Sequence, residues 1–143
     1  MNNKETRILG IDLGTKWVGL AIADWEIKIA TGFEVIEYKN KAKFIDSLKT
    51  IAKDENIGLI VFGLPKNMDD TEGPKAKEAR KIAELVKNSI AVEIDFEDES
   101  LTTFQAIRDL HSGEGTVGKS REKINMMAAI LILQSYLDNL SSK

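Results

Sequence analysis

The chain has 143 residues, of which 43% are hydrophobic and 30% are charged, and its formal net charge is −3. These values are typical of one globular domain with a hydrophobic core, and they exclude a chain-wide basic field for nucleic-acid binding. With no cysteine and a single histidine, disulfides, thiolate metal sites and histidine-rich zinc sites are excluded, so any metal should be a hard, oxygen-bound cation such as Mg²⁺ or Mn²⁺.

The sequence shows no apolar signal segment at its start and no apolar run of membrane-spanning length. We therefore expect a cytoplasmic protein without membrane association. Residues 1–143 are expected to form a single domain, because no linker or internal repeat is visible.

The first predicted element is a hairpin over residues 7–24, with two strands joined by a tight turn at 14–16. Asp12 ends the first strand, and an acid in an apolar strand is costly unless a cation compensates it. Gly10 and Gly14 should leave open space beside Asp12 for a metal ion or a phosphate. The alternative is that Asp12 only caps the turn through backbone amides.

The next elements alternate between strands and helices. A third strand with a bulge at Gly32 should pair antiparallel with the hairpin, because no crossover separates them. An amphipathic helix, an apolar central strand, a loop, a second helix beginning at Pro74 and another strand follow. We expect the third strand at residues 27–38 and the first helix at 41–54. The central strand should cover 57–62, the loop 63–73 and the last strand 90–96.

The C-terminal part is predicted to be helical. Thr102 and Gln105 form a capping-box pattern, which predicts a third helix that runs to about His111. A glycine-rich polar loop should cover residues 112–120. The last helix, 121–140, is apolar nearly all round and should be the most deeply packed helix.

This order predicts an α/β fold with a five-stranded mixed sheet, in which three antiparallel strands are followed by two helix-linked parallel strands. Helices should cover both faces. Right-handed crossovers place the strand after the first helix beside the first strand, so Asp12 should lie in the middle of the sheet.

The densest acidic segment covers residues 93–99. Strand alternation sets the acids at 93, 95 and 97 on one side, which indicates a solvated edge face. Asp98 is interpreted as a helix-start acid beyond the strand end. Glu99 could also be a helix-start acid, but a functional role is favoured, because a strand end next to the Asp12 strand should place its carboxylate near Asp12.

Two carboxylates a few ångströms apart repel each other unless a divalent cation lies between them, as in many phosphoryl-transfer sites. The candidate third ligand is Asn125 at the start of the last helix, through its uncharged amide oxygen. The alternative is that Asn125 is an ordinary polar residue in the first turns of a helix.

Basic residues near the expected site are the candidates for phosphate binding. Trp17 and Trp25 could stack on bases, although the strand position of Trp17 favours a core role. The candidate substrate-binding residues are Thr15, Lys16, Lys66, Asn67, Lys119 and Arg121.

Four segments carry a family resemblance, and they run in family order through most of the chain. They include Gly-Ile-Asp-Leu-Gly-Thr in the first strand and Gly-Leu-Pro-Lys-Asn-Met after the central strand, and they lie at residues 9–21, 63–73, 98–103 and 123–137. At these residues the sequence resembles the YqgF/RuvX family of RNase H-like nucleases, described as Holliday junction resolvases and as pre-16S ribosomal RNA maturation nucleases.

The resemblance implies an RNase H-like fold and a metal site built from three acids. Asp12 matches the first acid and Glu99 the second, while the third falls on Asn125. Two family arginines also fall on other residues, Ser100 and Trp17. Loss of one negative charge should weaken metal binding, and loss of two cations should weaken the hold on nucleic acid.

The expected function is a Mg²⁺- or Mn²⁺-dependent nuclease that acts on structured RNA, with the pre-16S rRNA of pre-ribosomal particles as the leading substrate. The alternatives are a Holliday junction resolvase acting on branched DNA and a nucleic-acid-binding member with weakened catalysis. A monomer or weak homodimer is expected. The first motif also resembles the phosphate loop of the actin, chaperone and sugar-kinase superfamily, but ATP binding of that kind needs a second lobe.

Overall fold

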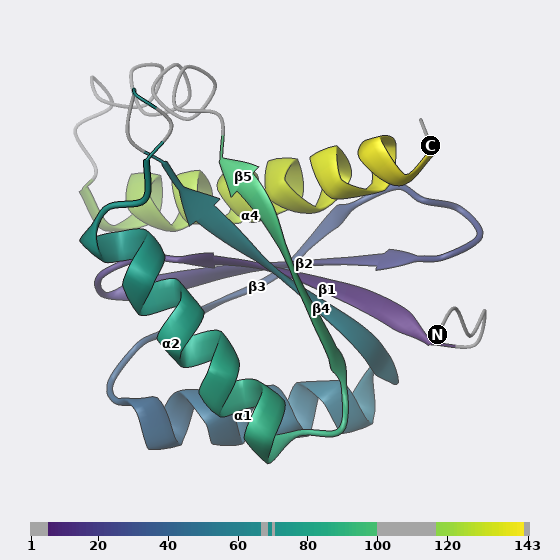
Figure 1. Cartoon of the computed structure of the whole chain (residues 1–143), viewed down its shortest axis with the longest axis horizontal. Coiled ribbons are helices and arrows are strands. Elements are labelled where there is room, and N and C mark those ends of the chain that lie inside the picture. The colour runs from purple at the N-terminus through teal and green to yellow at the C-terminus, as the bar shows by residue number, and fades with distance from the viewer. Residues whose placement is uncertain (1–5, 67–68, 70, 100–116, 142–143) are drawn as a thin grey trace.

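The computed structural model describes residues 6–66, 69, 71–99 and 117–141, with the backbone alone for 117–121 and 141. Figure 1 shows one twisted sheet with helices on both sides. Its elements are β1 (Arg7–Leu13), β2 (Trp17–Asp24), β3 (Thr31–Glu37), α1 (Lys41–Asp54), β4 (Ile57–Pro65), α2 (Pro74–Ser89), β5 (Glu93–Glu99) and α4 (Val117–Ser141).

The five strands are hydrogen-bonded in the order β3-β2-β1-β4-β5. β1 pairs antiparallel with β2 and parallel with β4, and β4 pairs parallel with β5. The predicted mixed sheet and the central position of β1 are therefore confirmed, and the tight turn before β2 is closed by a 3.0 Å hydrogen bond from Gly14 N to Trp17 O.

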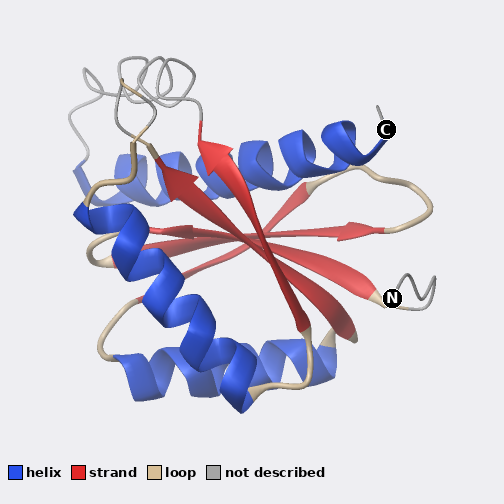
Figure 2. Ribbon diagram, viewed as in Figure 1, coloured by secondary structure: helices blue, strands red, loops and turns tan. Residues whose placement is uncertain are grey.

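Side-chain alternation in β1 divides the core into two layers. Ile8 is buried on the face covered by α4, whereas Leu9 and Ile11 are buried on the face covered by α1 and α2. Among the elements that the structure describes, Figure 2 shows α4 on one side of the sheet and α1 and α2 on the opposite side. As predicted, the last helix packs extensively, since it contacts all five strands.

Two glycines let α4 approach the sheet closely. A Cβ on Gly19 would lie 2.0 Å from the backbone oxygen of Asn125, and a Cβ on Gly10 would lie 2.7 Å from Leu133 Cβ. Only a glycine tolerates a helix at such a distance. The prediction that Gly10 leaves space for a metal or phosphate is therefore wrong, because α4 fills that space.

The predicted bulge at Gly32 is confirmed, since the β2–β3 register shifts between Leu20 and Ala21, where Gly32 is the partner of Ala21. The third strand nevertheless begins at Thr31 rather than at residue 27. The preceding loop contains Lys28 at φ 57° and is attached to α4 through Gln134, which accepts from Ala30 N at 2.9 Å.

Other predicted boundaries also move. β4 continues to Pro65 and β5 to Glu99, because the two strands pair in register as far as Pro65↔Glu99. Residues 63–65 are thus strand rather than loop, and β5 begins at Glu93 rather than at residue 90. α4 begins at Val117, within the predicted 112–120 loop. The predicted 102–111 helix and residues 112–116 lie outside the described residues.

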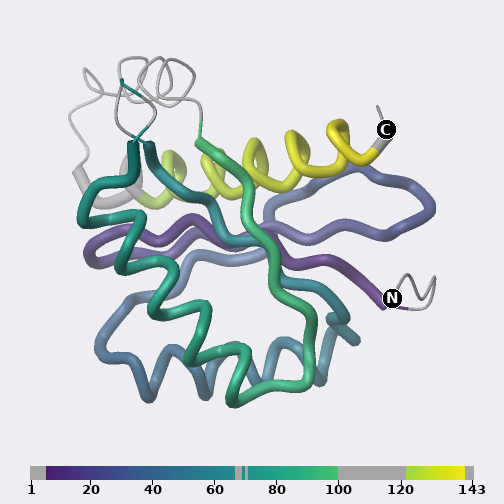
Figure 3. Tube along the Cα trace, viewed as in Figure 1, coloured from purple at the N-terminus to yellow at the C-terminus, as the bar shows by residue number. Residues whose placement is uncertain are grey.

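No helix in the described part of the chain combines the length and apolarity needed to cross a membrane. The chain path brings early and late elements together, because β1 near the start lies under α4, the last element (Figure 3). This arrangement determines which side chains meet at the end of the sheet.

Candidate functional site

A cavity of about 760 Å³ opens where β1, β4 and β5 end and where α2 and α4 begin. Parallel strands present their carboxyl ends at the same edge of a sheet, where ligands of α/β proteins commonly bind. The cavity is lined by Asp12, Leu13, Gly14, Thr15, Lys16, Trp17, Pro65, Lys66, Gly73, Pro74, Lys75, Glu99, Ile124 and Asn125.

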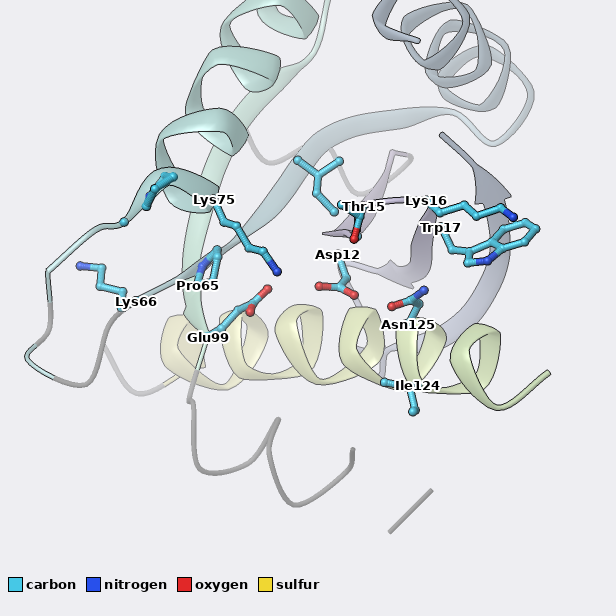
Figure 4. A pocket seen from close by; sticks show the side chains of 14 residues that line it. Asp12, Thr15, Lys16, Trp17, Pro65, Lys66, Lys75, Glu99, Ile124 and Asn125 are labelled. Atoms are coloured by element: carbon cyan, nitrogen blue, oxygen red, sulfur yellow. The ribbon is translucent and has the colours of Figure 1, made fainter. Parts of the chain in front are cut away.

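The three predicted metal ligands line this one cavity. Asp12 comes from the end of β1 and is buried, with 5% of its surface exposed. Glu99 is the last residue of β5, and Asn125 lies in the early part of α4. Figure 4 shows all three side chains directed toward the same space. The structure therefore brings together three positions that are far apart in the sequence, the first and last of them by more than a hundred residues.

Glycines determine how close these side chains come to the strands. The close approach at Gly19 fixes the backbone of Asn125 against β2. A Cβ on Gly14 would lie 3.6 Å from Asn125 Oδ1, and one on Gly63 would lie 2.8 Å from Glu99 Oε1. The Glu99 carboxylate therefore occupies space that a larger residue at 63 would take, whereas the Asn125 amide lies at ordinary contact distance from position 14.

The donor set fits a hard divalent cation. Within the described ranges there is no group of three or more His, Cys, Asp or Glu side chains that could hold a metal. The cavity offers two carboxylates and one amide oxygen. Oxygen donors of this kind suit Mg²⁺ or Mn²⁺, which keep several waters when few protein ligands are available.

Three lysines line the same cavity, namely Lys16, Lys66 and Lys75. Lys66 is paired with Asp98 at 3.5 Å, so Lys16 and Lys75 balance the two carboxylates that line the cavity. Figure 4 shows the Lys75 amino group extending from the start of α2 toward Glu99. Ammonium groups beside the carboxylates favour the binding of a phosphate group there.

Lys75 was not predicted as a site residue. Its sequence signal is weak, because a lysine that follows Pro74 in the first turn of a helix is an ordinary exposed residue. It becomes informative only when the structure places the start of α2 over the ends of β1 and β5.

The segment after β4 is held by ionic contacts. Lys66 forms an ion pair with Asp98 at 3.5 Å and a β-bridge with Glu72. Arg80 of α2 donates two hydrogen bonds to Glu72, at 2.7 and 2.6 Å, and also lies over the Phe96 ring. These bonds lower the pKa of Glu72 and raise that of Arg80. The prediction that Asp98 lies beyond the end of the strand is therefore wrong. Asp98 lies within β5 and forms an ion pair.

The predicted substrate-binding residues divide into two groups. Thr15, Lys16 and Lys66 line the cavity, and the first two are exposed. Asn67 lies outside the described residues. Lys119 and Arg121 lie at the start of α4, where the structure describes the backbone only.

The prediction that Trp17 belongs to the core is wrong. Trp17 is half-buried and lines the cavity, with the Lys16 ammonium 5.6 Å from its ring centroid. It is the first residue of β2, next to the turn, so the strand's buried pattern begins only at Val18.

The sequence predicted that the acidic edge face of β5 is solvated, but two of its carboxylates accept hydrogen bonds from α4. Tyr136 of α4 donates a 2.6 Å hydrogen bond to Asp95, while Ser135 and Asn139 donate to Glu97 at 2.7 and 2.9 Å. Burial and the neighbouring Asp95 carboxylate raise the pKa of Tyr136. The acids of β5 therefore fasten α4 to the edge of the sheet.

The chain is similar over nearly its whole length to proteins named as nucleases. A protein of Clostridioides difficile named "Putative pre-16S rRNA nuclease" is 41% identical over 132 residues, which cover 92% of this chain and 94% of that protein. Proteins with the same name from Leuconostoc mesenteroides and Thermoanaerobacter pseudethanolicus are 41% and 38% identical, covering 93% and 96% of this chain and 95% and 99% of their own lengths.

Two solved structures share the fold at low sequence identity. Thermus thermophilus RuvC in complex with a Holliday junction substrate gives a TM-score of 0.59 at 12% identity, covering 96% of this chain and 97% of RuvC. Fowlpox virus resolvase with Holliday junction DNA gives 0.55 at 14% identity, covering 94% and 99%. The fold is accordingly RNase H-like. A family model described as RuvX, Holliday junction resolvase, matches residues 6–139, and with the relatives above this match shows that the chain belongs to the RuvX family.

Proposed function

We propose that this chain is a divalent-metal-dependent nuclease that hydrolyses phosphodiester bonds, with the 5′-end maturation of pre-16S rRNA as its main reaction in the cytoplasm. The observation that carries the proposal is that Asp12, Glu99 and Asn125 line one cavity together with three lysines. Oxygen donors for a cation beside ammonium groups for a phosphate are what metal-assisted phosphodiester hydrolysis requires. The names of the relatives support the RNA substrate.

In this proposal, the carboxylates of Asp12 and Glu99 and the Oδ1 atom of Asn125 hold Mg²⁺ or Mn²⁺. When bound, such an ion activates water at neutral pH and stabilises the leaving oxygen. Lys75 and Lys16 bind the non-bridging oxygens of the scissile phosphate, because both side chains line the cavity and carry ammonium groups. The burial of Asp12 limits the water around the carboxylates and strengthens these electrostatic contacts.

A second candidate function is resolution of four-way DNA junctions. It is favoured by the description of the matching family model and by the two solved structures that contain junction DNA. Paired cuts need two active sites, so this function would require at least a weak homodimer. Cleavage of a junction at two symmetric positions would distinguish it from RNA maturation.

A third candidate is binding without cleavage, and Asn125 is the reason to consider it. An amide supplies a neutral oxygen where a carboxylate would add charge, which weakens attraction for a divalent cation. This function predicts salt-dependent RNA binding that Mg²⁺ does not convert into cleavage.

The proposal is tested by incubating labelled pre-16S RNA and a four-way DNA junction with the protein and either Mg²⁺ or Mn²⁺. We expect metal-dependent cleavage of the RNA by the wild type. Asp12→Asn should reduce the rate by about 100-fold or more, because it removes one of the two charged ligands. Circular dichroism and the Tm should show that the variant is folded.

Asp46→Asn is the matched control, since Asp46 is an exposed residue of α1 on the opposite side of the sheet. It makes the same chemical change without touching the cavity and should leave the rate unchanged. Full activity of Asp12→Asn would place the reaction elsewhere in the molecule. Cleavage that persists in EDTA would contradict the metal dependence.

A further inference from the structure

Trp17 stands at the edge of the cavity nearest to Asn125. It lines the same cavity as Asp12 and Asn125, and it is only half-buried. Figure 4 shows its indole ring beside the Asn125 amide, with the Lys16 side chain running along it. A large aromatic ring held partly in water beside a candidate phosphate site is a feature that the proposed metal chemistry does not explain.

The backbone that carries this ring is fixed on both sides. Gly14 N donates to Trp17 O at 3.0 Å, which closes the turn, and Tyr38 N donates to Lys16 O at 2.7 Å, which ties the same segment to the end of β3. A Cβ at Gly14 would lie 2.3 Å from Trp17 O and 3.6 Å from Asn125 Oδ1. The turn therefore holds the backbone of Trp17 at a set place relative to the amide, and a contact with the ring needs little further ordering.

The Lys16 ammonium complements the indole chemically. It lies 5.6 Å from the centroid of the Trp17 ring, within the range of a cation–π contact. A ring bordered by a cation can contact a nucleobase through its π-face and the attached phosphate through the ammonium group. This combination of groups is typical of sites for single-stranded nucleic acid.

We propose that Trp17, with Lys16, is a stacking platform for one unpaired nucleobase of the substrate, next to the phosphate that is cut. This inference rests on the proposed nuclease function and adds the class of substrate to it. A base inside a duplex has both faces covered by its neighbours, so only an unstacked base can lie on the indole. The preferred substrate is therefore a single strand, a junction or a bulge at the cleavage site, and not a continuous duplex.

The platform is tested by binding in EDTA, where no metal-dependent cleavage occurs. The probes are a single-stranded RNA pentanucleotide, its abasic counterpart with the same phosphates, and a blunt RNA duplex. Binding is followed by tryptophan fluorescence and, independently, by anisotropy of end-labelled RNA. The chain has two tryptophans. Trp25 follows the opposite end of β2, about 25 Å away at roughly 3.3 Å per residue, so Trp25→Phe is the matched control.

We expect the pentanucleotide to quench the fluorescence of wild type and of Trp25→Phe. Trp17→Leu should bind it roughly 5- to 100-fold more weakly and lose the quenching. Trp17→Phe keeps an aromatic face and should bind within about threefold of wild type, by anisotropy. Wild type should bind the abasic strand as weakly as Trp17→Leu binds the intact one, and Trp17→Leu should not weaken abasic binding further.

Equal affinity of wild type and Trp17→Leu for the pentanucleotide would overturn the platform, and so would equal affinity of wild type for the intact and abasic strands. Such results leave the nuclease proposal standing if Asp12→Asn is inactive. Conversely, Trp17-dependent binding in EDTA with full cleavage by Asp12→Asn would refute the metal site alone. The two proposals can therefore fail separately.

Discussion

Asn125 determines how many charges the candidate metal site carries. Among the residues described, two carboxylates and one amide oxygen line the cavity, and three lysines oppose them. A third carboxylate would increase the attraction for a divalent cation, but it would also add repulsion to the buried Asp12 when no cation is bound. The residue at 125 therefore links metal affinity to the stability of the metal-free protein, with opposite signs.

We predict that Asn125→Asp binds Mn²⁺ about tenfold more tightly than wild type, because ligand charge governs the affinity for hard cations. The same variant should have a lower Tm than wild type in EDTA, and Mn²⁺ should reverse the order. Titration calorimetry and thermal denaturation measure the two effects. Asn88→Asp on the exposed side of α2 is the control. An unchanged affinity in Asn125→Asp would remove residue 125 from the ligand set.

At the scale of elements, the spacing between α4 and the sheet positions the site. Gly19 lies directly under the backbone of Asn125, and Gly10 lies under Leu133, which is further along α4. Neither Gly10 nor Gly19 is among the residues that line the cavity. Their contribution is to let the helix lie close enough for the Asn125 amide to reach the cavity beside Asp12.

Gly19→Ala should destabilise the fold by about 1–3 kcal/mol, since the new Cβ meets backbone atoms that cannot rotate away. It should also weaken Mn²⁺ binding in the folded fraction, because α4 must shift at Asn125. Chemical denaturation and calorimetry measure these effects. Gly58→Ala is the matched control, because the three atoms nearest to its Cβ all belong to the Thr6 side chain and none to α4. Equal losses in the two variants would argue against a specific role for the α4 contact.

The segment that follows β4 depends on the Glu72–Arg80 pair. The pKa of Glu72 is lowered, chiefly by the Arg80 hydrogen bonds. A lowered pKa stabilises the contact above the ordinary carboxyl value of 4.5, and this contribution is lost as the pH falls through the lowered value. The contact between this segment and α2 should therefore be intact at neutral pH and weaken only in acid.

We predict that Glu72→Gln increases hydrogen exchange at the amides of Lys66 and Thr71 at neutral pH, because one partner of the bidentate pair is lost. Wild type and variant should converge as the pH falls through the lowered pKa of Glu72. Arg80→Lys should resemble Glu72→Gln, since lysine cannot form the two parallel bonds. Glu84→Gln, an exposed change on the same helix, should have no effect. A difference that persists in acid would assign the effect to something other than this ion pair.

For the molecule as a whole, the periodicity of the sequence was sufficient to predict a mixed sheet with β4 beside a central β1, because alternation in β1 and the helical crossovers leave few topologies. It also placed Asp12 and Glu99 at the same edge of the sheet, but the expectation that their strands are adjacent was wrong, because β4 lies between β1 and β5. The strand limits were less predictable, because β4 and β5 extend each other by pairing as far as Pro65↔Glu99, and no local pattern reports that pairing.

The site residues that were missed or misread depend on tertiary contacts. Lys75 is an ordinary helix-start lysine until α2 is docked, and Trp17 looks like a core residue until the turn places it at the cavity edge. Likewise, the acids of β5 look solvated until Tyr136 of α4 reaches Asp95. Each of these residues has a role that depends on a tertiary contact. The periodicity of hydrophobic residues along the sequence does not report such contacts.

The position of Asn125 has a consequence for the newly made polypeptide. The cavity needs β1 from near the start, β5 from the middle and α4 from the end. A growing chain that has exposed only its five strands holds two of the three proposed cation ligands, with the α4 face of the sheet uncovered. On the proposed ligand set, the complete cation site therefore forms only after α4 has left the ribosome, and a shorter nascent chain carries at most two of the three ligands.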